Sequence, residues 1–169
     1  IAYLGSDSSL MFSADRQAGY QTVLLRHGLP VNPEYCVEIS SLLKDFSGKI
    51  RQLLALPERP TAVLVSDDIL ALALERVCLE TGLSIPRDLS IISFNNSLLA
   101  RLSVPQLTSI DVNSFQLGIE AASQVINHIE NPNLMATKII VPHHLIERES
   151  CCQAADPLPS GTAHEAAAP

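Results

Sequence analysis

Short apolar runs alternate along this chain with longer segments in which apolar residues recur every three or four positions. The clearest runs lie at residues 1–4, 62–65 and 89–94, and each ends at glycine, serine, aspartate or asparagine. Helix-like periodicity fills about 13–27 and 69–81 between them. Such alternation is typical of β-α-β units, so the sequence predicts an α/β fold with a parallel sheet flanked by helices.

Local signals place the ends of several elements. Gly28 and Gly82 follow helical segments, as C-terminal capping residues do. Asn113 followed by Gln116 resembles a capping box at the start of a helix. The other predicted elements are helices at about 43–56 and 115–130 and strands at 35–39, 107–110 and 138–141, with 145–147 extending the pairing.

Composition limits what this part of the protein can contact. The 169 residues are 47% hydrophobic and 17% charged, and the net charge is −7. A domain with this net negative charge is not expected to carry the basic surface that binds the phosphates of nucleic acid. No apolar run approaches the ~20 residues that span a membrane, and no secretory signal is visible. Four cysteines at spacings that suit neither zinc nor a disulfide framework indicate the cytoplasm.

Polar residues follow three predicted strands. They are Ser6 and Asp7, the pair Asp67 and Asp68, and Asn95. The carboxyl ends of parallel strands share one edge of a sheet, where ligands bind. Amide and carboxylate groups there suit a polyhydroxylated ligand, although Asp and Asn are also ordinary helix caps, and the pattern leaves both readings open.

Catalytic and metal-binding readings are weak. The pair Asp67 and Asp68 invites comparison with the magnesium site of a response-regulator receiver, but no lysine lies between Lys49 and Lys138 to complete it. His143 and His144 would point to opposite faces of an extended segment. Nucleotide-binding and hydrolase motifs are absent. We therefore expect neither an enzyme nor a bound metal or cofactor.

Two features indicate binding surfaces. Arg16 lies in the first turn of its helix, against the helix dipole, on the predicted ligand edge. The segment 69–81 carries charge only at Glu75, Arg76 and Glu80 and is apolar around most of its circumference. Since covering a sheet requires only about a 100° apolar arc, a second face is buried against another subunit or inside a larger chain.

Several motifs together resemble the lactose-repressor/galactose-repressor (LacI/GalR) family of bacterial transcriptional regulators. They run in order and at family spacing from residue 1 to about 150. The matching stretches are Asp15-Arg16-Gln17-Ala18-Gly19-Tyr20, Pro60-Thr61-Ala62-Val63 with Val65-Ser66-Asp67-Asp68, Gly82 to Asn96, Pro105 to Ile110, Leu117-Gly118 and Arg148-Glu149-Ser150.

The resemblance implies part of a two-lobed, periplasmic-binding-protein-like effector domain at 1–150, followed by a disordered tail at 151–169. Residues 1 to about 110 would form most of the C-terminal lobe, and the helix 115–130 would cross to the N-terminal lobe. Family positions that hold a sugar or purine effector match Arg16, Asp67 and Asn95, and less securely Phe12 and Leu43. Asn95 stands where Asp is more usual, and Ser93 to Ser97 resemble repressors of maltose operons, which indicates a maltodextrin effector.

The family also forms dimers through this lobe. The residues that the resemblance places at the homodimer interface are Ile69, Leu70, Ala73, Leu74, Val77, Leu98 and Leu102. Effector binding would allosterically control a DNA-binding headpiece that lies outside this chain. The alternatives are a periplasmic sugar-binding protein of a transport system, which would rarely keep four free cysteines in an oxidising compartment, and an α/β enzyme without a visible catalytic motif.

Overall fold

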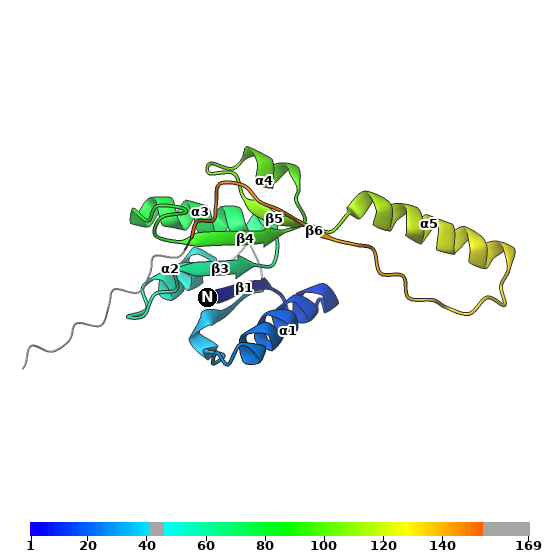
Figure 1. The fold of residues 1–169 in the computed structure, drawn as a ribbon, viewed down its shortest axis with the longest axis horizontal. Helices are drawn as coiled ribbons and strands as arrows, with labels where there is room; N and C mark the ends of the chain where they lie inside the picture. Colours follow the sequence, from blue (N-terminus) through cyan, green and yellow to red (C-terminus); the bar gives the residue numbers. More distant parts are fainter. Residues whose placement is uncertain (41–45, 154–169) are drawn as a thin grey trace, which may run out of the picture.

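A six-stranded sheet forms the centre of the computed structural model, which describes residues 1–40 and 46–153 (Figure 1). Its strand order is β2-β1-β3-β4-β5-β6, and every pairing is parallel except that of β5 with β6. The predicted α/β class is confirmed. The strands are β1 (Ala2–Ser6), β2 (Cys36–Ile39), β3 (Ala62–Val65), β4 (Ser90–Phe94), β5 (Thr108–Asp111) and β6 (His144–Ile146).

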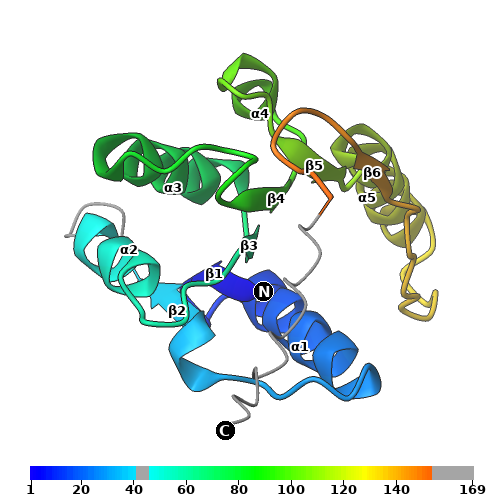
Figure 2. The same ribbon diagram turned by 60° about the vertical axis from the view of Figure 1, so that its left-hand side comes forward.

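Helices cover both faces of the sheet. In Figure 2, α2 and α3 lie on one side of the strands and α1 lies on the other. The helices are α1 (Met11–Arg26), the 3-10 turn η1 (Pro33–Tyr35), α2 (Phe46–Leu54), α3 (Asp68–Thr81), α4 (Leu98–Leu102) and α5 (Ser114–Glu130). The sequence predicts all of them except η1 and α4, which are only three and five residues long.

The ends of α1 and α3 follow the predicted signals. Gly28, just beyond α1, has φ +69°, and Gly82 at the end of α3 has φ +76°. The Gly82 N–H donates to Cys78 O and Leu79 O, so the last carbonyls of α3 are satisfied. Glycine adopts this left-handed conformation without steric cost, which explains why both helices stop where they do.

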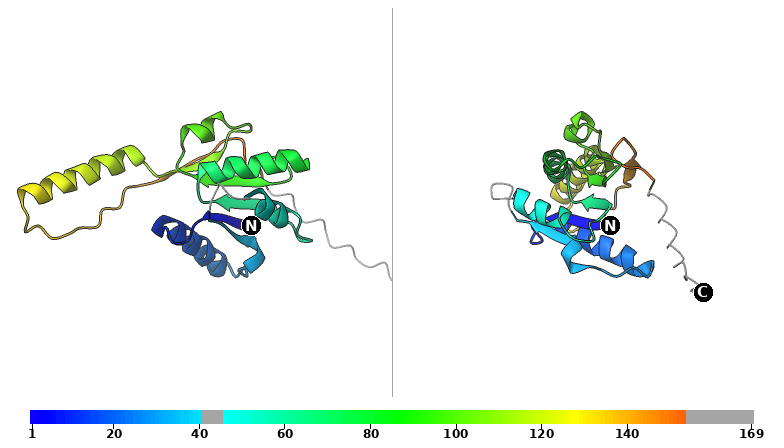
Figure 3. Two further views of the ribbon diagram at one scale, coloured as in Figure 1. Left: turned by 180° about the vertical axis from the view of Figure 1, so that it is seen from behind. Right: turned by 90° about the vertical axis from the view of Figure 1, so that its left-hand side faces the viewer.

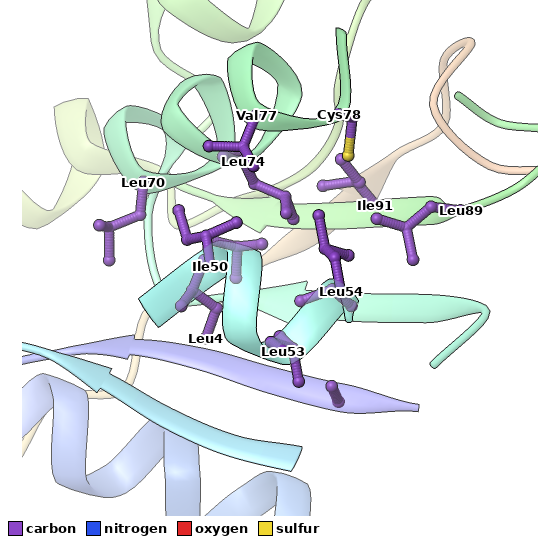
Figure 4. Close-up of a cluster of buried hydrophobic side chains, with 14 of the residues drawn as sticks. Leu4, Ile50, Leu53, Leu54, Leu70, Leu74, Val77, Cys78, Leu89 and Ile91 are labelled. Atoms are coloured by element: carbon purple, nitrogen blue, oxygen red, sulfur yellow. The ribbon is translucent and has the colours of Figure 1, made fainter. Parts of the chain in front are cut away.

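The core lies between the sheet and the pair α2 and α3 (Figure 4). Leu4 of β1, Ile50 of α2, Leu74 of α3 and Ile91 of β4 are completely buried there. Burying each such side chain contributes about 1.5–3 kcal/mol. A single apolar layer therefore fixes α3 against β3 and β4, and with it the start of α3 at the edge of the sheet.

Helix α5 projects away from this core, as Figures 1 and 3 show, and none of its residues is buried. Its predicted capping box is wrong, because Asn113 makes no side-chain capping bond and Gln116 donates instead to Glu120. The predicted strand at 138–141 is also wrong: this stretch runs back from α5 beyond the sheet. An isolated strand has no neighbour to satisfy its backbone groups.

The chain returns from α5 to the sheet through β6. Beyond it, the Ser150 hydroxyl donates to Ile91 O at 2.6 Å and accepts from the Thr108 N–H at 2.8 Å. Cys151 Sγ also donates to Ile91 O, and the Cys152 N–H donates to the Ser90 hydroxyl. These hydrogen bonds join Cys151 and Cys152 to β4.

Two further predictions concern residues outside the described part. Leu43, a predicted effector residue, falls within 41–45, and most of the predicted disordered tail falls within 154–169. Among the described residues, no helix combines the length and the apolar character needed to cross a membrane.

Candidate functional site

The polar ends of β1, β3 and β4 lie at one edge of the sheet, because these strands are parallel neighbours. The Ser6 N–H donates to the Ser66 hydroxyl at 3.0 Å, which joins the ends of β1 and β3. The Ser13 hydroxyl of α1 donates to Ser6 O at 2.9 Å, so the first turn of α1 is fixed to the same edge. The predicted clustering of these strand ends is present.

Arg16 of α1 reaches across this edge. Its guanidinium donates to Ser66 O at the end of β3 and to Asn95 Oδ1, at 3.3 Å, just past β4. The guanidinium carbon lies 5.1 Å from the centre of the Phe12 ring and 4.4 Å from that of the Phe94 ring. Stacking on aromatic faces and planar donation both suit arginine and would not be reproduced by lysine.

The Arg16 side chain carries its charge at a partly desolvated position. Burial lowers the pKa of the guanidinium, while the fields of Tyr3, Asp67 and Asp68 oppose this shift. None of the described carboxylates is hydrogen-bonded to Arg16, which donates to the Ser66 carbonyl oxygen and the Asn95 amide oxygen. A guanidinium held by neutral acceptors retains N–H groups that can donate to a ligand oxygen.

Asp67 combines a capping role with a place at the edge. Its Oδ1 accepts the Leu70 N–H at 2.9 Å, which makes Asp67 the N-cap of α3. Its Oδ2 accepts the Ser66 hydroxyl at 3.2 Å. Each carboxylate oxygen can accept a second hydrogen bond, so capping does not exhaust the group.

The backbone turns sharply after β4. Asn95 and Asn96 have φ values of +97° and +48°, a region that non-glycine residues rarely adopt. The Asn95 N–H donates to Ile110 O at 2.9 Å, and the Asn96 amide donates to Asp111 Oδ2 at 2.9 Å. Asn96 Oδ1 in turn accepts from Arg148, so the turn that carries Asn95 is held on both sides.

Asp68 has a different role from its neighbour. It is 2% exposed and accepts the Ser93 hydroxyl, the Ser109 hydroxyl at 2.9 Å and the Ser97 N–H at 2.7 Å. It therefore ties α3 to β4, β5 and the start of α4. In residues 1–40 and 46–153, no group of three or more His, Cys, Asp or Glu side chains is arranged to hold a metal ion.

Of the predicted effector residues, the structure brings together Arg16, Asn95 and Phe12, with Asp67 adjoining them. Sequence reasoning missed Phe94 and Ser66, which position Arg16 directly. The sequence signal that could have identified them is that they directly precede the predicted site residues Asn95 and Asp67. Their contacts with Arg16 join residues about 50 or more positions apart, and no local pattern reports those contacts.

An apolar cavity of about 580 Å³ adjoins this edge and lies between α1 and the sheet. Its walls include Val23 of α1, Leu64 of β3 and Ile92 of β4, and Arg16 and Phe94 line it as well. Most of this space offers no hydrogen-bonding groups to sugar hydroxyls. The polar strand ends, and not this cavity, have the chemistry of the predicted effector site.

The predicted dimer residues separate into two groups. Leu70, Leu74 and Val77 are at most 2% exposed and face the sheet and α2, so the core already occupies them. The prediction that these three residues lie at a dimer interface is wrong, because they belong to the apolar face of α3 that packs against the core. The predicted residues Ile69, Leu98 and Leu102 are at least 53% exposed. Leu79 and Val104, which were not predicted, are exposed as well, and we call these five residues the α3–α4 surface. Ala73 is half-buried beside the core.

The fold and this edge define a class of protein, the α/β ligand-binding lobe with its binding groups at the carboxyl ends of parallel strands. The periplasmic binding protein-like domain model matches residues 1–151. The chain belongs to this family.

Individual relatives are transcriptional regulators. Catabolite control protein A of Priestia megaterium is 31% identical over 137 residues, 81% of this chain and 41% of that protein. HTH-type transcriptional repressor CytR of Escherichia coli K12 is 33% identical over 135 residues, 80% of this chain and 40% of that protein. A LacI transcriptional regulator from Bacillus cereus subsp. cytotoxis has a solved structure with a TM-score of 0.86 and 33% identity, covering 91% and 55% of the two chains.

The chain therefore spans about two-fifths of the length of these curated relatives. The relatives support a LacI-type regulator with a periplasmic-binding-protein-like domain, and their names do not point to a maltose operon.

Proposed function

We propose that this chain is the effector-binding part of a cytoplasmic LacI/GalR-type transcriptional repressor. The observation that carries the proposal is the position of Arg16. Its guanidinium is held at the polar strand ends by Ser66, Asn95 and Phe94 and retains N–H groups that can donate to a ligand. Effector binding at this edge would be linked to operator binding by a headpiece outside these 169 residues. Such control requires that the effector bind two conformations with different affinity.

The proposed effector is a neutral sugar, with a maltodextrin as the first candidate. Arg16 supplies donors, Asp67 supplies acceptors, and Asn95 supplies both, which matches the paired donor and acceptor character of adjacent sugar hydroxyls. The Phe12 ring, 46% exposed beside Arg16, gives an apolar surface for a sugar ring face.

We further propose that a second copy of the chain docks on the α3–α4 surface. Two-fold pairing uses the same surface on both subunits, so these exposed apolar residues on one copy can meet their equivalents on the other. Exposed apolar patches of this kind are typical of interaction sites. A periplasmic transport protein of similar fold is the less favoured alternative, because the relatives are transcriptional regulators.

The test is Arg16→Ala in the intact protein. Losing a charged donor to the sugar costs about 1.5–3 kcal/mol, so affinity should fall roughly 10- to 150-fold. Calorimetric titration begins with maltose and extends to other sugars until a ligand saturates the wild type. Arg26→Ala, at the exposed far end of α1, is the matched control and should bind normally. If Arg16→Ala retains both wild-type sugar affinity and wild-type induction, the assignment is wrong.

A further inference from the structure

Glu75 occupies an unusual position on α3. With Leu72 and Leu79 it forms one stripe, because residues three and four positions apart lie on the same helix face. Leu79 is 81% exposed and Leu72 is half-buried. Asp68, two turns earlier on this stripe, accepts the N–H of Ser97, the N-cap of α4. The stripe that carries Glu75 therefore faces α4 and adjoins the α3–α4 surface.

The Glu75 carboxylate has no compensating partner in the described chain. Its Oε1 is buried without any hydrogen bond. Desolvation by burial raises its pKa to about 7, and no neighbouring charge contributes to that shift. An unpaired buried carboxylate is costly in its charged form and much less so when protonated.

Arg59, in the loop before β3, has a buried Nη1 without a hydrogen bond, but its charge acts on Cys78 and adds nothing to the pKa shift of Glu75. The other charged groups nearby have partners of their own. On α3 itself, Arg76 pairs with Glu80, and Glu80 also pairs with Arg51 of α2. Lys49 of α2 donates to Glu38 O. Cys78, one turn after Glu75, is a buried thiol.

The other elements that pack against α3 carry few titratable groups. Arg101 of α4 is exposed and acts on Asp111, and Tyr3 of β1 stacks on Tyr20 on the opposite face of the sheet. Strands β3 and β4 carry no titratable side chain.

We propose that docking of a second copy on the α3–α4 surface takes up a proton at Glu75. The inference rests on the proposed function, since it needs the partner copy. That copy removes remaining water from the edge of the stripe and supplies an apolar surface, so the charged carboxylate becomes less favourable still. The neutral acid fits the same space without this cost, and dimerisation is thereby linked to pH.

The sign of the linkage follows from the raised pKa. A carboxyl group that is harder to ionise in the dimer than in the monomer binds more protons in the dimer. The contribution of Glu75 to dimer stability is fully present below about pH 7, the pKa of the carboxyl group in the monomer. It is lost as the pH rises through the higher pKa that Glu75 has in the dimer. One linked proton per subunit changes the dissociation constant by up to about tenfold per pH unit, so two subunits give up to about 100-fold.

Analytical ultracentrifugation of the intact protein between pH 6 and pH 8.5 tests the proposal. The wild-type dissociation constant should rise at least about tenfold over this range. Glu75→Gln, which has the shape of the neutral acid, should dimerise tightly with little change over the same range. Glu58→Gln, at an exposed loop position, is the matched control and should behave as the wild type.

The outcomes separate this inference from the proposed function. A wild-type dimer whose affinity does not change with pH overturns the role of Glu75 and leaves the dimer surface intact. The same holds if Glu75→Gln keeps the wild-type pH dependence, because another group would then take up the proton. A protein that is monomeric at every pH overturns the proposed dimer, and the role of Glu75 with it.

Discussion

Removing the Asp68 carboxylate should destabilise the protein more than removing any exposed acid. Asp68 accepts hydrogen bonds from two serine hydroxyls, Ser93 and Ser109, that are completely buried. A hydrogen bond to a charged group contributes about 1.5–3 kcal/mol, so two give about 3–6 kcal/mol. The truncated protein no longer buries a carboxylate, which offsets part of this loss. We expect a net loss of about 3 kcal/mol for Asp68→Ala.

Urea unfolding followed by circular dichroism measures this loss, and thermal unfolding gives a second reading. For a domain of this size, about 3 kcal/mol corresponds to a fall in Tm of about 6–12 °C. Asp68→Asn keeps one acceptor oxygen in the same place, so it should lose less than Asp68→Ala. A loss below about 1 kcal/mol for Asp68→Ala would show that the bonds to Ser93 and Ser109 do not hold α3 to the sheet.

Two further predictions concern the ends of α3. Gly82→Ala should cost about 1 kcal/mol because alanine is strained at φ +76°, whereas Gly19→Ala, inside α1 with no atom within 4 Å of the added methyl group, should be neutral or stabilising in the same unfolding assay. Asp67→Ala should cost about 1 kcal/mol through loss of the helix cap, and Asp67→Asn should restore most of it; equal losses would exclude capping as the cause.

Local signals account for the part of the fold that the sequence predicts well. The strand at 62–65 matches β3 at both ends, and α3 is within one residue of its predicted start. Both predictions depend on an apolar run followed by a capping residue, and this local pattern can be recognised without knowing any distant contact. Helix α4 was missed because five residues contain too little periodicity to distinguish it from a loop.

The errors arise where a decision depends on tertiary contacts. An apolar pattern at 138–141 favours a strand, but a strand forms only beside a partner. Likewise, an apolar circumference on α3 cannot show which face the core takes, so Leu70 and Leu74 were assigned to a partner subunit and belong inside. Arg16 and Asn95 stand out by their places at a helix start and a strand end and again in the family motifs, while the stacking of Arg16 on Phe94 required the structure.

The location of a bound sugar tests the central claim most directly. A crystal structure of the intact protein, saturated with the sugar that binds most tightly in the titration series, measures it. The account predicts that sugar hydroxyls lie within hydrogen-bond distance of the Arg16 guanidinium and the Asn95 amide at the strand ends. A sugar seated in the apolar cavity between α1 and β4, or away from the sheet edge altogether, would contradict it.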